Sequence, residues 1–181
     1  MYYSFTEEIV NREIILNMKK SILLILFCLF LLLSACGKTE LTAPFAENVK
    51  WDMGETEMKT ALGEPTETYL SVYGGDCFTY PCTYLDRDGT LKIMYDEKGK
   101  LASVAWAYVT WDSEDLKELT ASITDAETKL HGNTSVDPNG RGTQGSVWYT
   151  DGGDILTASI AVDGQYGFQY SYIDKAHSGR G

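Results

Sequence analysis

The sequence has few of the residues that most often carry catalysis or bind metals and nucleic acids. Its 181 residues include four cysteines, two histidines and four prolines, and 15 Lys and Arg stand against 26 Asp and Glu. The net charge of −11 disfavours nucleic acid as a partner, because an acidic surface repels phosphates. The length allows one compact domain with appendages and excludes a large multidomain enzyme.

Recognisable catalytic and cofactor motifs are also missing. The chain has no Gly-x-Ser-x-Gly, no glycine-rich phosphate loop and no His-Glu-x-x-His. His131 and His177 each lack a neighbouring histidine with which to share a metal. Residues 86–89 begin like a calcium loop but lack its later acids, so a hairpin turn is the simpler interpretation. We therefore expect a protein that is not an enzyme and binds no cofactor and no metal.

The one long apolar run lies near the start of the chain. Residues 18–35 carry two lysines, an apolar stretch and then small residues before Cys36, which is typical of a secretion signal. The quartet Leu33-Ser34-Ala35-Cys36 resembles the bacterial lipobox. That resemblance implies a lipoprotein signal peptide at 18–35, cleaved so that Cys36 carries diacylglycerol and becomes the mature N-terminus. A plain signal peptide cut near Ala35 is the alternative.

The charge pattern around this signal suggests how the protein is attached. Residues 1–17 contain three acids ahead of the basic start, so we interpret them as an upstream extension and Met18 as the true start. Since as many acids as bases precede Cys36, the charge of −11 belongs to the exported part. Acyl chains such as palmitate, and not anionic headgroups, would then hold it. The expected location is the outer face of the cytoplasmic membrane, or the outer membrane of a Gram-negative cell.

Two further cysteines, Cys77 and Cys82, follow in the exported part. Nearby thiols outside the cytoplasm are usually oxidised, which predicts a structural disulfide. Closing so small a loop would stabilise the fold by roughly 2 kcal/mol in the chain-entropy model. A redox-active pair would need Cys-x-x-Cys at the start of a helix, which this spacing does not provide.

The remaining sequence predicts an α+β domain at residues 50–174, preceded by a lipidated tether at 36–49 and followed by a flexible tail at 175–181. A helix is expected at 54–62, ended by Gly63, and a second at 112–131, with a break near Thr120 left open. Strands are expected at 67–73, 80–86, 90–96, 100–109, 145–150, 154–162 and 165–173. Similar turns in the two halves predict repeat units at about 50–109 and 110–174.

Within the first unit, Met53-x4-Met58-x3-Leu62-Gly63-Glu64-Pro65 resembles the opening motif of the BamE (SmpA/OmlA) family of small envelope lipoproteins. The tandem helix-plus-sheet layout resembles that of the β-lactamase inhibitory protein. The resemblance implies tandem helix-plus-antiparallel-hairpin units that form a curved antiparallel sheet with helices on one face. It places the chain among the uncharacterised Gram-positive lipoproteins of this kind.

Hairpin register predicts which side chains share a face of such a sheet, because opposite residues of an antiparallel pair point the same way. Three-residue loops ending in Gly would pair Asp86 with Thr90 and Asp96 with Lys100. A turn at 162–164 would place Ile160 opposite Tyr166. The face expected in the core carries Leu85, Leu91, Ile93, Tyr95, Leu101, Val147, Tyr149, Leu156, Ala158, Ile160, Tyr166, Phe168 and Tyr170. The face expected to be open carries Tyr84, Lys92, Met94, Trp106, Tyr108, Trp148, Thr157, Ser159 and Gln169.

The expected open face mixes aromatic, Met, Lys and small polar residues, which is typical of an interface. We therefore expect a membrane-anchored, non-enzymatic protein-binding module whose binding residues are Tyr84, Met94, Trp106, Tyr108 and Trp148. Three alternatives stay open. A bulge between Ser103 and Trp106 would turn Trp106 and Tyr108 inward. The chain could instead be a small-ligand or glycan-binding sensor or chaperone of the cell envelope, or a secreted hydrolase of unrecognised type.

Overall fold

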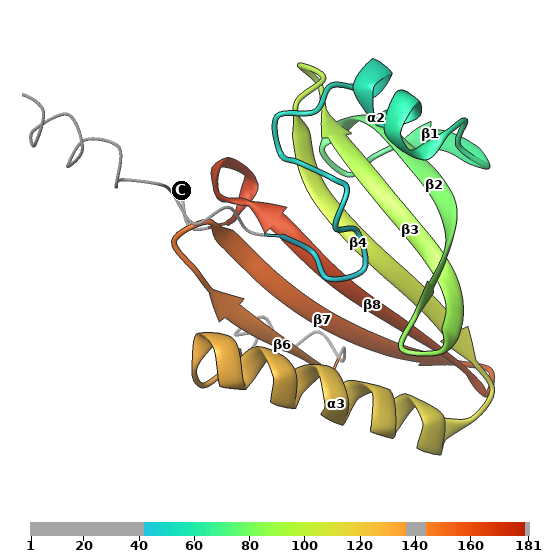
Figure 1. Cartoon of the computed structure of the whole chain (residues 1–181). Coiled ribbons are helices and arrows are strands. Elements are labelled where there is room, and N and C mark those ends of the chain that lie inside the picture. Colours follow the sequence, from blue (N-terminus) through green and yellow to red (C-terminus); the bar gives the residue numbers. More distant parts are fainter. Residues whose placement is uncertain (1–41, 137–143, 180–181) are drawn as a thin grey trace, which may run out of the picture. The chain divides into compact units, whose positions relative to one another are not determined.

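A computed structural model describes residues 42–136 and 144–179 of the chain (Figure 1). The elements are α2 (Glu55–Leu62), β1 (Glu67–Leu70), β2 (Gly74–Tyr84), β3 (Arg87–Asp96), β4 (Leu101–Thr110), α3 (Ser113–His131), β5 (Ser135–Val136), β6 (Gln144–Tyr149), β7 (Gly153–Val162), β8 (Gln165–Asp174) and the short 3-10 helix η1 (Lys175–His177). The expected helices and strand segments are confirmed within a few residues, except that β2 begins earlier. The strand β5 was not expected, and α3 is unbroken at Thr120.

The strands form one open eight-stranded sheet in the order β1-β2-β3-β4-β8-β7-β6-β5, and every neighbouring pair is antiparallel. The expected fold class, an α+β domain of tandem helix-plus-hairpin units, is wrong. Strands dominate the described residues, which contain only two α-helices. The physical reason is that β4 pairs with β8 from Ser103↔Ile173 to Thr110↔Tyr166, which merges both halves of the chain into one continuous sheet.

One face of this sheet, here called the inner face, carries the main core. Its side chains include Phe78, Ile93, Val104, Trp106, Phe168, Tyr170 and Tyr172. Met58 of α2, together with Leu119 and Ile123 of α3, packs into the same cluster. Phe45 and its neighbours Ala43 and Ala46 are also part of it, so the domain begins before the expected start at residue 50. At the other end, η1 and the buried Ser178 belong to the folded part and not to a tail.

Two tight turns set a register different from the expected one. Leu85 and Asp86 form the turn between β2 and β3 with φ of 49° and 58°, so Tyr84 pairs with Arg87. Positive φ at both central residues is the geometry of a two-residue type I′ hairpin. Asp163 and Gly164 do the same between β7 and β8, so Ile160 lies opposite Gly167 and not Tyr166. Each pairing differs from the expected one by an odd number of positions, which moves one strand's side chains to the other face.

A β-bulge on β4 is a third difference from the expected register. The backbone amide of Asp96 donates to the carbonyl of Lys100 at 2.8 Å, as expected, but Met94 pairs with Ser103 while Tyr95 pairs with Leu101. Ala102 is the extra residue, so beyond it Trp106 lies opposite Leu91 and shares the inner face. Trp106 therefore points inward, as in the alternative with a bulge on β4, but the bulge lies before Ser103 and not between Ser103 and Trp106.

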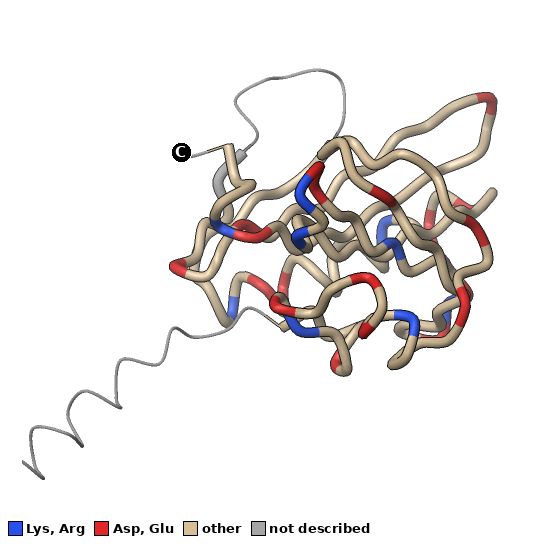
Figure 2. The backbone as a smooth tube through the Cα atoms, turned by 90° about the horizontal axis from the view of Figure 1, so that it is seen from above, with Lys and Arg blue, Asp and Glu red and all other residues tan. Residues whose placement is uncertain are grey.

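Charged side chains attach the start of α3 to the sheet. Asp115 accepts hydrogen bonds from Arg87 Nε and from the hydroxyl of Tyr108, both at 2.7 Å. Asp112 caps the helix by accepting the Glu114 amide at 2.8 Å. Elsewhere, acidic residues are distributed along the whole described backbone with fewer Lys and Arg among them (Figure 2). The position of α3 over the inner face is what forms the site described next.

Candidate functional site

The two tryptophans expected on the open face are in the core. Trp106 is 0% exposed and Trp148 is 1% exposed. The indole Nε1 of Trp106 donates to the carbonyl of Cys82 at 3.0 Å, and its ring stacks on Tyr108 with centroids 5.6 Å apart. The predicted exposure of these side chains is wrong, because the turns and the bulge place them on the inner face.

The other predicted binding residues lie in three different environments. Met94 is on the opposite face, buried beside Cys77 and Ala105. Tyr108 is half-buried at the start of α3. Tyr84 is half-buried on the inner face, where its ring meets Phe45 at a centroid distance of 5.8 Å. Among the five, only Tyr84 lines the cavity described below.

The structure does not contain the predicted disulfide, and Cys77 and Cys82 are free thiols in it. Both lie within β2, where Cys77 pairs with Met94 and Cys82 with Gly89. Five residues of extended strand separate their Cα atoms by roughly 16 Å and point the side chains to opposite faces. A disulfide needs Cα atoms within about 7 Å. Burial raises the pKa of both thiols, and Cys36 lies outside the described residues.

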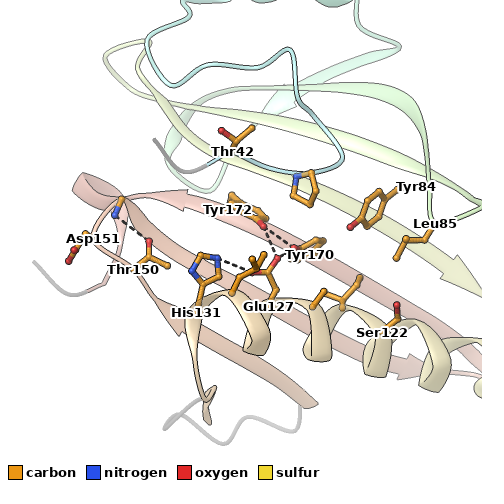
Figure 3. Close-up of a pocket in the computed structure, with 15 residues that line it drawn as sticks. Thr42, Tyr84, Leu85, Ser122, Glu127, His131, Thr150, Asp151, Tyr170 and Tyr172 are labelled. Carbon is orange, nitrogen blue, oxygen red and sulfur yellow. Dashed lines mark hydrogen bonds and ion pairs between the residues drawn. The ribbon is translucent and has the colours of Figure 1, made fainter. Parts of the chain in front are cut away.

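A cavity of about 580 Å³ lies between α3 and the inner face (Figure 3). It is bordered by the segment before α2, the β2–β3 turn, α3, the β6–β7 turn and β8. The lining residues are Thr42, Pro44, Tyr84, Leu85, Ser122, Ile123, Ala126, Glu127, Leu130, His131, Thr150, Asp151, Gly152, Tyr170 and Tyr172.

Glu127 is the central polar group of this cavity. It follows Leu119 and Ile123 at intervals of four residues along the buried stripe of α3, and it is 2% exposed. The hydroxyls of Tyr170 and Tyr172 both donate to its Oε1, the second at 2.8 Å, and lie 2.9 Å from each other. The imidazole Nε2 of His131 lies 3.3 Å from Oε2. Figure 3 shows these four side chains converging from α3 and β8.

The two tyrosines act as neutral donors in this cluster. Burial is the main cause that raises the pKa of Tyr170 and of Tyr172, and the nearby Glu127 raises both further. Burial and the charge of Glu127 also raise the pKa of Tyr84. The phenols therefore keep their protons well above neutral pH, and the carboxylate accepts.

The chemistry of the lining favours ligands that donate hydrogen bonds or carry positive charge. Among the described residues that line the cavity, Glu127 and Asp151 are acidic, and none is Lys or Arg. Leu85, Ile123 and Leu130 supply apolar surface beside them. An anion would meet only repulsion here, apart from His131 when it is protonated.

Sequence reasoning missed this site, although a signal was present. A helix at 112–131 with apolar residues at 119 and 123 places residue 127 on the same stripe, one turn further on. An acid at such a position is unusual, because a buried carboxylate needs partners. Those partners come from β8, more than 40 residues later in the chain. No local sequence pattern indicates that β8 lies beside residue 127.

Other site types find no counterpart within residues 42–136 and 144–179. No group of three or more His, Cys, Asp or Glu side chains there is arranged to hold a metal ion. None of the helices in these ranges combines the length and apolar character that crossing a membrane requires.

Comparisons with known proteins include a similarity to a solved structure. No family model matches the chain, and no curated protein matches it. The fold is similar to that of a DUF4309 family protein (YjgB) from Bacillus subtilis subsp. subtilis str. 168, with a TM-score of 0.39 and 14% sequence identity over 68% of this chain and 80% of that one. The resemblance to the BamE family and to the β-lactamase inhibitory protein stays a prediction.

Proposed function

We propose that the chain is an exported, lipid-anchored, non-enzymatic binding protein of the cell envelope whose domain takes up a small ligand in the cavity beneath α3. The observation that carries the proposal is a cavity of about 580 Å³ with a buried carboxylate in its lining. Small-molecule sites are commonly about 300 to 1,000 Å³ and mostly apolar, with a few polar groups that fix orientation.

The placement of Glu127 supports a ligand site over a purely structural role. A helix that only had to pack on the sheet would continue the stripe of Leu119 and Ile123 with another apolar residue. Burying a carboxylate costs several kcal/mol unless partners satisfy it. Here the partners Tyr170 and Tyr172 serve one oxygen, and the carboxylate borders a cavity.

Filling the cavity with a larger side chain tests whether it binds a ligand. Ala126 and Ala121 are both exposed residues of α3, but only Ala126 lines the cavity. We expect Ala126→Trp to abolish binding of small probes and Ala121→Trp to retain it. The probes are a panel of short amines, neutral monosaccharides and short carboxylates. Ligand-observed NMR detects whether each one binds. The ligand-binding proposal fails if no class binds, or if both variants behave alike.

The lipid anchor rests on the Leu33-Ser34-Ala35-Cys36 quartet after the apolar run. Cys36→Ala should abolish incorporation of labelled fatty acid and shift the protein from the detergent phase to the aqueous phase, or block its processing. Cys28→Ala is the matched control, because Cys28 lies inside the apolar run. Unchanged lipid labelling in the Cys36 variant would contradict the anchor.

A protein partner is the second candidate function, now on a different surface. Apolar side chains that are more than half exposed lie near one another at the ends of β4 and β7, and exposed apolar groups of this kind can mark interfaces. They are Val109, Trp111, Ile160 and Val162. A photocrosslinking residue at 111 should give one discrete adduct in cells, whereas the same residue at exposed position 118 should give none. Identical adducts at both positions would remove this candidate.

A further inference from the structure

We infer that the cavity beneath α3 selects a primary-amine cation, which donates hydrogen bonds to Glu127 while its alkyl part lies against the apolar lining. This inference rests on the proposed function and names the ligand class for that site. Three independent observations lead to it.

The first observation is the charge of the cavity. Glu127 is 2% exposed, and the donors to its Oε1 are neutral phenols. The described lining holds a second acid, Asp151, and no Lys or Arg, so the fixed charge there is negative. His131 offsets it only when protonated. A ligand cation would remove the cost of a poorly compensated buried charge.

The second observation is the state of the other carboxylate oxygen. Oε2 of Glu127 is buried and has no hydrogen bond of suitable geometry from the described residues, although His131 Nε2 lies 3.3 Å away. A buried carboxylate oxygen without a donor is unfavourable. A ligand N–H would supply that donor. A quaternary ammonium carries charge but no N–H, so this observation favours a primary amine over it.

The third observation is the remaining wall of the cavity. Tyrosine rings from β2 and β8 border it, and Leu85, Ile123 and Leu130 add aliphatic surface. Aromatic faces attract cations, and aliphatic surface accommodates a short alkyl chain. Neutral sugars would gain the hydroxyl contacts but not the ionic contact, and carboxylates would be repelled.

Four probes that share a pentyl group separate the contributions of charge, N–H donation and apolar contact to binding by the full-length protein. They are pentylammonium, pentyltrimethylammonium, pentan-1-ol and hexanoate, titrated at pH 8, where an ordinary imidazole is neutral. We expect pentylammonium to bind about tenfold or more tightly than pentanol, as a charge-assisted hydrogen bond of about 1.5 to 3 kcal/mol predicts. Pentyltrimethylammonium should bind more weakly than pentylammonium, and hexanoate weakest. Equal affinities for pentylammonium and pentanol would overturn the inference, as would tighter binding of the quaternary ion.

Variants of Glu127 and Ala126 test whether the amine binds in the cavity. They also distinguish failure of the amine inference from failure of the proposed ligand-binding function. Glu127→Gln should reduce pentylammonium binding to the level of pentanol, and Ala126→Trp should abolish it while Ala121→Trp retains it. If Glu127→Gln does not fold, the four-probe series on the unaltered chain still decides. Binding of a monosaccharide, but of no amine, that Ala126→Trp abolishes would overturn the amine inference and leave the proposed function standing. Absence of any Ala126-sensitive binding would overturn both.

Discussion

Trp106 shows how much depends on the orientation of a single side chain. It is 0% exposed, donates to Cys82 and stacks on Tyr108. We expect Trp106→Ala to lower the free energy of unfolding by about 3 to 5 kcal/mol, because it leaves a large cavity in the core. Urea unfolding measures this. The matched control is Trp111→Ala, since Trp111 is 72% exposed and its loss should change stability by less than about 0.5 kcal/mol. Equal, small effects would restore the open-face interpretation.

The thiols give a second test at this scale. In a chain with Cys28 and Cys36 replaced by alanine, unfolding without reductant should make both Cys77 and Cys82 react with a maleimide. In the folded protein Cys82, which is half-buried, should react before Cys77, which is 0% exposed. Mass spectrometry counts the adducts. Two thiols that stay unmodified in denaturant until reductant is added would prove the disulfide.

The burial of single side chains was predicted less well than the positions of the helices and strands. Trp148 and Trp106 were assigned to a surface through hairpin register, although large aromatics are more often buried than not. Glu127 was overlooked because its partners Tyr170 and Tyr172 are far away in sequence. In both cases, the deciding contacts join residues whose proximity only the tertiary fold provides.

At the scale of elements, helix ends and strand segments were predictable because their signals are local. Gly63 and Gly132 end the helices where expected. The β2–β3 turn was not predictable in the same way, because Leu at a positive φ is uncommon and Arg87-Asp88-Gly89 offered a more conventional turn. The register of a hairpin follows from its turn, so one atypical leucine reversed the assignment of a face.

That turn leads to a third prediction. Replacing Leu85-Asp86 by Asp-Gly, as found in the turn at Asp163-Gly164, should raise the free energy of unfolding by about 1 kcal/mol, because it removes left-handed strain from a branched residue. Urea unfolding measures the gain. A loss of stability would contradict the two-residue turn.

Gly89→Ala is the matched contrast. The expected register made Gly89 a turn residue, but it lies within β3, where an added Cβ would come 2.5 Å from Trp106 Nε1 and 2.6 Å from the Ala107 carbonyl oxygen. We expect a loss of about 1 to 3 kcal/mol, typical of overpacking.

The contact between β8 and α3 predicts a loss of stability in alkali. The pKa values of Tyr170 and Tyr172 are raised in the folded state, chiefly by burial. The stabilisation is therefore complete below about pH 10, the pKa of an unfolded tyrosine, and is lost as pH rises above it. Each such tyrosine contributes a slope of up to about 1.4 kcal/mol per pH unit, reached when the unfolded phenol is fully ionised. Tyr170→Phe should reduce the slope by about 1 kcal/mol per pH unit in urea unfolding between pH 10 and 11, where the unfolded phenol is about half to nine-tenths ionised. An unchanged slope would contradict the raised pKa.

At the scale of the whole molecule, the fold class was mispredicted because the pairing of β4 with β8 is long-range. Each half of the sequence carries its own turns and strands, which suggested separate units. Two antiparallel edges that both carry apolar side chains gain more by pairing with each other than by facing water. The central β4–β8 pair therefore joins residues more than 50 positions apart, and no local pattern specifies it.

The start of the domain leads to the last prediction. Residues 42–49 were expected to be a tether, yet Phe45 packs against Tyr84, Tyr170 and Tyr172 at centroid distances of 5.8, 5.2 and 5.9 Å. Removing residues 1–49 should therefore lower the free energy of unfolding by at least about 3 kcal/mol, which is the cost of losing one buried phenylalanine. Removing residues 1–38 should leave it nearly unchanged.

Point variants make this prediction independent of truncation. Phe45→Ala in the full chain should lose about 3 to 5 kcal/mol, whereas Glu47→Ala, at an exposed position two residues later, should change stability by less than about 0.5 kcal/mol. Pro44 lines the cavity, so the longer truncation should also weaken binding of pentylammonium. Equal urea midpoints for the two truncated chains would place the start of the domain at residue 50 and remove this segment from both the core and the site.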